Sequence, residues 1–266
     1  MLIKCKSIDD EKKINEYIGN NYDKCLYLYL DFEKYKFSNP NVSIWIQTNN
    51  SIITSIILKY YSGMHIFSNH CDYDVEEIKN LIDKEKPTMI CGEKTIVCDI
   101  YKNLDISNYL IETGWVRRLS TTRDFDRTDV ELAKEEDFYQ IAKLLYQDED
   151  LGSSYQLEDL KEQMINRNKE EYARNYIIRK DGKVVSHAGT GAENKKVAML
   201  SYVITDENYR GKGYAQKLCS AVCQYLIEEG KEVFLVNYST ESTRLYDKLG
   251  FKVCCEWGKI FLDLKK

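Results

Sequence analysis

Residues 208–218, NYRGKGYAQKL, place two glycines among basic side chains directly before an amphipathic run. Gly211 and Gly213 flank Lys212, and Arg210 precedes them. A glycine-rich turn that opens a helix directs successive backbone N–H groups and the positive end of the helix dipole toward one point. The two basic side chains add positive charge in an acidic protein. The stretch therefore predicts a binding site for a pyrophosphate.

Two common nucleotide-binding motifs do not fit this turn. A Walker P-loop aligned on Gly211 and Lys212 has Asp206 at its first glycine position and Gly213 where Ser or Thr is required. A Rossmann fingerprint has Gln216 at its last position, and the surrounding elements do not form repeating parallel units. Both motifs are therefore excluded.

The elements that must position the turn follow from the hydrophobic periodicity of the second half. They run in the order strand, two helices, three antiparallel strands, helix, strand, helix and two strands. The expected segments are a strand at 130–133, helices around 138–145 and 157–167, strands within 175–191 and at 197–205, a helix at 215–230, a strand at 232–238, a helix at 241–250, and strands at 252–257 and 259–264. The glycine turn thus joins a strand to the start of a helix.

The stretch RGKGYA fits the pattern [QR]-x-x-G-x-[GA] in this strand-to-helix position. Here the chain resembles the GNAT superfamily of N-acetyltransferases, whose element order residues 130–266 follow throughout. YVITDENYRGKGYAQKL is similar to the form seen in glycine N-acyltransferase-like members, and ESTRLYDKLGF resembles a second segment of the family. The resemblance implies an α/β (α+β) fold. Its sheet would be mixed, mostly antiparallel and twisted, flanked by helices, with a splayed pair of strands in the C-terminal domain.

The resemblance also implies that the turn holds the pyrophosphate of acetyl-CoA, with the pantetheine arm beside the preceding strand. The free backbone groups of that strand would bind the arm as an added strand would. Many family members hydrogen-bond the arm through an Asn seven residues before the family's tyrosine, which corresponds to Tyr246 here. This chain has Ser239 at that position, with Asn237 on the same strand face. The expected cofactor-binding residues are Val203, Ile204, Thr205, Arg210, Gly211, Lys212, Gly213, Tyr214, Ala215, Asn237 and Ser239.

The implied reaction is direct transfer of an acyl group from the CoA thioester to an amine. A backbone N–H near Val203 would stabilise the carbonyl oxygen as negative charge develops. Tyr246 occupies the position of the family's general-acid tyrosine, and a phenol can donate a proton to the departing thiolate. The alternative for Tyr246 is a packing role on a short helix.

No residue type at a diagnostic position identifies the general base. The strand at 197–205 has no carboxylate, where some family members carry a catalytic Glu. His187 has a suitable intrinsic pKa and is the first candidate, although a lone strand histidine is more often structural. Glu193 and the run Asp148-Glu149-Asp150 are the other candidates, and the acidic run is also explained as a solvated loop.

The first half repeats the same order of elements more faintly, which predicts a diverged internal duplication with domains at 1–127 and 128–266. Where the glycine turn would be expected, the first half has NHCDYDVEEIKN, which is acidic and contains no glycine. Acidic side chains repel a pyrophosphate. We therefore expect the N-terminal domain to be a degenerate GNAT-like domain without a CoA site.

Composition narrows the classes of partner. The 266 residues carry a formal net charge of −5, which argues against a nucleic-acid partner. The first residues lack the apolar core of a signal peptide, and the most apolar run, SIITSIILKYY, is too short for a bilayer, so we expect a cytoplasmic protein without a membrane partner. The nine cysteines show no metal-site spacing, so we expect free thiols and no metal.

Together these features predict an acetyl-CoA-dependent N-acetyltransferase with acetyl-CoA as co-substrate. The acceptor would be a small-molecule or peptide amine, and the sequence leaves both the amine and an oligomeric state open. The alternative is a non-catalytic CoA-binding or protein-interaction module on the same fold.

Overall fold

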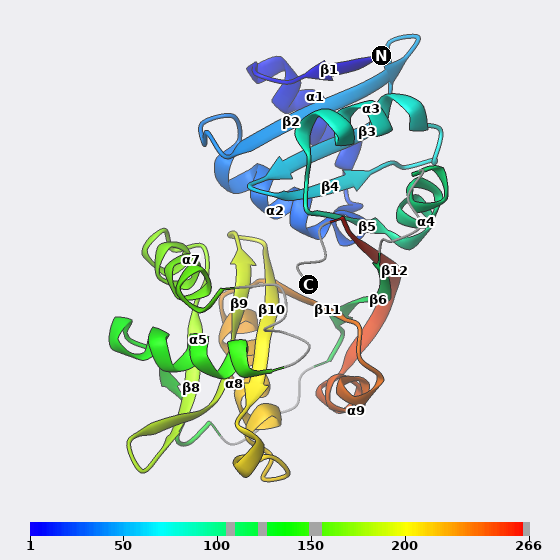
Figure 1. Ribbon diagram of the computed structural model, residues 1–266. Coiled ribbons are helices and arrows are strands. Elements are labelled where there is room, and N and C mark those ends of the chain that lie inside the picture. Colours follow the sequence, from blue (N-terminus) through cyan, green and yellow to red (C-terminus); the bar gives the residue numbers. More distant parts are fainter. Residues whose placement is uncertain (105–109, 122–126, 149–155, 263–266) are drawn as a thin grey trace. The chain divides into compact units, whose positions relative to one another are not determined.

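The computed structural model describes residues 1–104, 110–121, 127–148 and 156–262 (Figure 1). The chain forms two compact units that are interleaved in sequence. Unit 1 comprises Met1–Val116, Val236–Ser239 and Val253–Lys266, and unit 2 comprises Arg117–Leu235 and Thr240–Lys252. These units are defined by contacts between residues, whereas the expected boundary at 127/128 separates two duplicated halves of the sequence. That boundary therefore remains a prediction.

Unit 1 is a sheet covered by helices. Its helices are α1 Ile8–Ile18, α2 Leu26–Tyr35, α3 Val75–Glu85 and α4 Lys94–Asn103, and its own strands are β1 Leu2–Lys4, β2 Val42–Asn49, β3 Ile52–Tyr60, β4 Gly63–Phe67 and β5 Met89–Glu93. Three further strands are divided between the units: β6 Leu110–Leu119, β11 Glu232–Asn237 and β12 Phe251–Phe261. The strand order β1-β2-β3-β4-β5-β12 is antiparallel except for the parallel pair β4 and β5.

Unit 2 repeats this arrangement. Its helices are α5 Phe138–Gln147, α7 Leu157–Lys169, α8 Tyr214–Glu228 and α9 Thr240–Leu249, and its own strands are β7 Glu131–Leu132, β8 Asn175–Lys180, β9 Lys183–Glu193 and β10 Val197–Thr205. The order β11-β10-β9-β8-β7 is antiparallel except for the parallel pair β10 and β11. The mixed, mostly antiparallel sheets predicted from the sequence are therefore confirmed.

The parallel pair of unit 2 separates along its length. β10 and β11 pair only from Val197 and Glu232 to Met199 and Phe234, whereas β10 continues to Thr205. In unit 1 the equivalent pair β4 and β5 stays in register from Gly63 to Ile66. The splayed strand pair predicted for the C-terminal half is thus present, and the described residues of unit 1 show no counterpart.

A β-bulge lies in β10 beyond the point of separation. Ser201 is opposite Gly189 and Ile204 is opposite His187, so two residues of β10 face one residue of β9. Tyr202, inside the bulge, has a φ of 56°, a left-handed conformation that costs free energy in a residue other than glycine. Such a bulge bends the strand and redirects its peptide groups.

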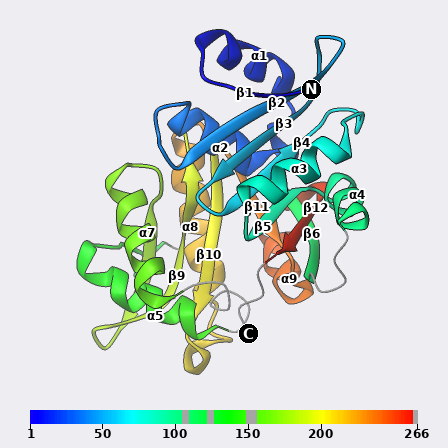
Figure 2. The same cartoon turned by 45° about the horizontal axis from the view of Figure 1, so that its top comes forward.

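The sheet of unit 2 is buried on both faces. The apolar stripe of α8, with Leu218, Val222 and Leu226, packs on one face together with α9. Helices α5 and α7 cover the other face, where Phe138, Ile141 and Leu160 are buried (Figures 1 and 2). This arrangement fixes the glycine turn at the junction of β10 and α8.

Two expectations from the periodicity differ from the structure. The strands expected at 252–257 and 259–264 form one strand, β12, through Gly258. Gly258 is needed there because a Cβ would lie 2.8 Å from the Cβ of Val97 on α4, so it marks close packing and not a break. The helix α2 was not anticipated, because its sequence LYLYLDFEKY is buried on most sides and lacks an amphipathic period.

The cysteines, the acidic side chains and the helices bear on the expectations drawn from composition. All nine cysteines are free thiols, of which Cys219 and Cys223 lie in the core of unit 2. Among the described residues, no group of three or more His, Cys, Asp or Glu side chains is placed to hold a metal ion. Of the helices described, none is both long and apolar enough to cross a membrane.

Candidate active site

The glycine turn has a backbone that only glycine adopts readily. Gly211 and Gly213 have φ values of 76° and 79°, and Gly213 is the N-cap of α8. The first backbone N–H groups of a helix have no acceptor within the helix, and here no side chain of the N-cap residue accepts from them. A Cβ on either glycine would meet no protein atom within 4 Å. The positive φ therefore demands glycine, and the space in front of both residues is open.

Two basic side chains border the turn. Lys212 Nζ lies 4.6 Å from the centre of the Tyr209 ring. Arg210 folds back over the end of β10, where its Nε donates to the carbonyl oxygen of Thr205 at 3.1 Å and its Nη2 donates to Asp148 Oδ2 at 3.4 Å. The helix N-terminus thus faces a cationic surface in which the charge of Arg210 is partly balanced by one carboxylate.

The three strand residues expected beside the pantetheine arm lie where β10 has left β11. Ile204 is buried, and the Thr205 hydroxyl lies 2.7 Å from the hydroxyl of Ser186 on β9. Val203 belongs to the bulge and packs against the α8 core. The predicted residues from Val203 to Ala215 are therefore contiguous in space, with an unpaired strand edge leading into an open helix N-terminus.

Tyr246 of α9 lies in the core cluster next to α8. Its side chain is 8% exposed, its ring meets Phe251 edge to face at 5.9 Å, and its hydroxyl makes no hydrogen bond with a described residue. Burial, with Cys219 and Cys223 close by, raises its pKa well above the usual value of a phenol. Tyr246 is therefore a protonated donor whose hydroxyl is not committed to another described group.

Helix α9 is fixed from outside the glycine-turn region. Nη1 of the buried Arg117 donates to Asp247 Oδ1 at 2.7 Å, one residue from Tyr246. The backbone N–H and hydroxyl of Ser120 both donate to the carbonyl oxygen of Gly250, at 3.1 and 2.8 Å. Sequence reasoning missed Arg117, although an arginine pair in the apolar stretch GWVRRL is an available signal.

Asn237 is the last residue of β11, and Ser239 follows the strand; both belong to unit 1. The buried Asn237 side chain donates to the carbonyl oxygen of Ser239 at 2.9 Å. This contact shapes the backbone after β11, and a role of either residue in holding the cofactor arm remains a prediction.

His187 is placed differently from a general base. Its side chain is fully buried, Nδ1 lies 2.7 Å from the carbonyl oxygen of Tyr202, and Nε2 lies 3.0 Å from the side-chain amide of Asn175. Burial lowers its pKa to about 4. Both ring nitrogens are occupied and the ring is neutral near pH 7, so the geometry corrects our expectation that His187 takes a proton from the acceptor amine.

The carboxylates considered as bases are also engaged. Glu193 is buried, pairs with Arg174 at 2.7 Å and also contacts Lys231; these cations hold its pKa below the usual value although burial opposes them. Asp148 pairs with Arg210. Glu149 and Asp150 lie outside the described residues. Neither Glu193 nor Asp148 is therefore a carboxylate without an ion-pair partner.

The corresponding helix N-terminus in unit 1 is occupied by the chain itself. The carboxylate of Asp74, the N-cap of α3, accepts from the backbone N–H groups of Glu76 and Glu77 at 3.0 and 3.2 Å. The same first turn carries both glutamate side chains. Because these N–H groups are already bonded and the local charge is negative, the N-terminus of α3 is poorly suited to bind an anion.

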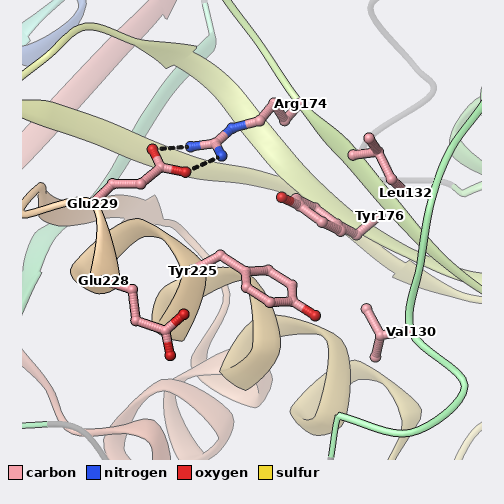
Figure 3. A pocket seen from close by; sticks show the side chains of 7 residues that line it. All are labelled: Val130, Leu132, Arg174, Tyr176, Tyr225, Glu228 and Glu229. Carbon is pink, nitrogen blue, oxygen red and sulfur yellow. Dashed lines mark hydrogen bonds and ion pairs between the residues drawn. The ribbon is translucent and has the colours of Figure 1, made fainter.

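A surface hollow of about 430 Å³ lies at the other end of α8. Figure 3 shows Tyr176 and Tyr225 facing each other there, with Glu229 bonded to Arg174. The rings are stacked at 5.4 Å, and Arg127 pairs with Glu228 at its edge. Since α8 has 15 residues, this hollow is about 20 Å from the glycine turn and is a separate feature.

The neutral, buried state of His187 makes stability depend on pH. Unfolded, the ring takes up a proton below its ordinary pKa of 6.5, whereas the folded ring does so only near 4. Stability is therefore complete above pH 6.5 and declines as the pH falls, by about 2 kcal/mol at pH 5. Denaturant unfolding between pH 7 and 5 gives the loss of unfolding free energy for the protein and for His187→Gln. The difference between the two losses is the contribution of His187. Equal pH slopes for the two proteins would contradict it.

The Arg210–Asp148 pair predicts a competition with an anionic ligand. Asp148→Asn frees Arg210, so CoA should bind about threefold tighter at low ionic strength, because partly exposed ion pairs contribute under about 1 kcal/mol. The gain should vanish in high salt. Titration calorimetry with CoA at low and high salt measures the gain and its loss. Glu162 is an exposed carboxylate on α7, so Glu162→Gln is a control that removes one negative charge elsewhere. The same gain in the control would show a general charge effect instead.

Comparison with known proteins agrees with this geometry. Residues 135–251 match the model of the acetyltransferase (GNAT) family. No curated protein sequence matches the chain. Among solved structures, a protein of Drosophila melanogaster is similar with a TM-score of 0.72 and 12% identity, covering 100% of this chain and 99% of that one.

Two further structures also extend over nearly the whole chain. A GNAT-family acetyltransferase of Colwellia psychrerythraea has a TM-score of 0.61 and 12% identity, covering 98% of each chain. A tandem GNAT protein from the clavulanic acid biosynthesis pathway has a TM-score of 0.58 and 12% identity, covering 98% of this chain and 97% of that one. At these identities the likeness concerns the fold. Residues 135–251 thus match the acetyltransferase (GNAT) family, and the whole length of the chain has the fold of GNAT structures.

Proposed function

We propose that this protein is an acetyl-CoA-dependent N-acetyltransferase whose catalytic residues lie in unit 2. The observation that carries the proposal is the continuity of an unpaired edge of β10 with the uncapped N-terminus of α8. An extended arm with an anionic end fits such a site, because the strand edge offers main-chain hydrogen bonds and the helix N-terminus offers N–H groups and a positive dipole.

Binding would begin at the turn. The backbone N–H groups from Gly211 to Ala215 receive the pyrophosphate, and Arg210 and Lys212 add charge. Arg210 would exchange its contact with Asp148 for the stronger negative charge of the ligand. The arm would then run along Thr205, Ile204 and Val203 toward the point where β10 and β11 separate.

The chemical step follows from the groups at that point. The neutral amine attacks the thioester carbonyl carbon, and a backbone N–H at the bulge stabilises the oxygen as it becomes negative. When the carbon–sulfur bond breaks, Tyr246 donates its phenolic proton to the leaving sulfur. Burial raises the pKa of the phenol, but it raises that of a thiol as well, as it does for Cys223, to about 12. Because burial shifts both pKa values in the same direction, it does not by itself prevent the proton transfer.

The acceptor class, an amine of a small molecule or peptide, is part of the proposal, and no described residue selects among amines. Unit 1 would not bind CoA, because Asp74 occupies the N-terminus of α3 and β4 remains paired with β5. A Cβ on Gly92 would lie 2.5 Å from the carbonyl oxygen of Ile66, so these two strands are in close contact. Unit 1 would instead support the fold and the acceptor site.

Acetyl-CoA should bind the full chain with a stoichiometry of one. Gly213→Ala should abolish or greatly weaken this binding, because the new Cβ projects into the open space before the helix N-terminus. Gly182→Ala is a matched control, since Gly182 has a φ of 77° and equally open surroundings at a hairpin tip. Titration calorimetry measures both, with ATP and NAD as control ligands. A second site, or unchanged binding by the Gly213 variant, would contradict the proposed site.

Tyr246→Phe should lower kcat for acetyl transfer by about 10²-fold or more, the usual contribution of a general acid, and leave the Kd of acetyl-CoA within about twofold. Free thiol release with glycine, spermidine, kanamycin and a short peptide as acceptors measures the rate. Turnover that is unchanged in the variant would exclude Tyr246 as the acid. Binding of acetyl-CoA without turnover of any amine would favour the alternative, a non-catalytic CoA-binding module.

A further inference from the structure

The buried histidine that is unsuited to be a base has a geometry that points to another role. His187 lies on β9 beside the bulge of β10, and its Nδ1 is 2.7 Å from the carbonyl oxygen of Tyr202. A carbonyl oxygen only accepts, so Nδ1 carries the hydrogen. The neutral ring then accepts at Nε2. The Asn175 atom placed 3.0 Å from Nε2 is Oδ1, which cannot donate, so we assign the reversed amide orientation, in which the NH₂ group faces Nε2.

This contact fixes one peptide group. The peptide that joins Tyr202 to Val203 is trans, as are the other peptides in the described parts of the chain, so its C=O and N–H point in opposite directions. Holding the carbonyl toward His187 on β9 therefore turns the N–H of Val203 away from β9. On that other side β10 has β11 as its neighbour, and pairing with β11 has already ended at Met199.

The strained backbone at Tyr202 indicates that its surroundings hold this peptide in place. Its φ of 56° is unfavourable for a tyrosine, and such strain persists only where surrounding contacts impose it. The contacts here come from two buried residues, since His187 is fully buried and Asn175 is 3% exposed. Asn175 is held in turn, because its backbone carbonyl accepts from the N–H of Ala133 at 2.8 Å.

We propose that Asn175 and His187 are positioning residues that hold the Tyr202–Val203 peptide so that the N–H of Val203 is aimed at the thioester carbonyl oxygen. The inference rests on the proposed function, since it concerns the same bound thioester. Neither side chain touches the substrate. They determine the direction of one donor, and the donor strengthens its hydrogen bond as negative charge develops on the oxygen.

A vibrational measurement tests the aim of this donor without turnover. The carbonyl band of acetyl-CoA labelled with ¹³C at the thioester carbon moves to lower wavenumber when the oxygen accepts a strong hydrogen bond. His187→Leu removes the N–H that holds Tyr202, and His187→Gln keeps an amide donor in its place. We expect a clear downward shift in the wild-type complex, most of it retained in the Gln variant and largely lost in the Leu variant, with the Kd of acetyl-CoA within about threefold.

Kinetics provide the second readout. Removing one oxyanion donor lowers kcat by about 10²- to 10³-fold in other enzymes, and a donor that is present but misdirected should cost about tenfold or more. We therefore expect His187→Leu to lower kcat at unchanged KM for acetyl-CoA, and His187→Gln to restore most of it. Ser186→Ala on the same strand, whose hydroxyl bonds to the carbonyl oxygen of Ile204 at 3.0 Å, is the control for a general disturbance of β9.

The outcomes separate this inference from the function on which it rests. An equal carbonyl shift in the wild type and the Leu variant would overturn the positioning role while acetyl-CoA binding stood. A Leu variant that is too unstable to study leaves His187→Met, which also lacks a donor to the carbonyl oxygen of Tyr202, and an unchanged band there would also overturn it. Absence of acetyl-CoA binding by the wild type would overturn the proposed function itself.

Discussion

The separation of β10 from β11 after three paired residues is the constraint on which the site depends. A strand inside a sheet has both edges bonded, and its backbone is then unavailable to a ligand. Here the bulge at Tyr202 bends β10 just beyond the last pair, so that the edge becomes free while both faces of the sheet remain covered by helices. This edge leads to the glycine turn, so a strand edge suited to an extended ligand is continuous with a helix N-terminus suited to an anion.

The two units show how one architecture can carry or lose such a site. Both have an antiparallel sheet with one parallel pair, followed by a helix at the same point in the order of elements. In unit 2 the N-cap of that helix is Gly213, which has no side chain to accept from the first N–H groups. In unit 1 the N-cap is Asp74, whose carboxylate accepts from them. The N-cap residue thus determines whether a side chain of the same protein bonds to the first N–H groups of the helix.

Burial changes the pKa values of polar side chains in unit 2, and with them the chemistry that these side chains can perform. Desolvation disfavours charge, so it keeps the phenol of Tyr246 protonated and the imidazole of His187 neutral. The first effect suits a proton donor, and the second excludes a base but suits a fixed hydrogen-bond donor. Arg117, also buried, is held by Asp247 and anchors the helix that carries Tyr246.

The sequence by itself determined the features that depend on near neighbours. The turn from Arg210 to Ala215, the helix after it and the hairpin at Asp181 and Gly182 could be predicted, because glycine conformations and helical periods are local properties. The tertiary structure decided the buried contacts of His187, the strained bulge at Tyr202 and the division of β6, β11 and β12 between units. These depend on hydrogen-bond partners and desolvation supplied by residues distant in sequence, such as Asn175 and Asp247, which no local pattern encodes.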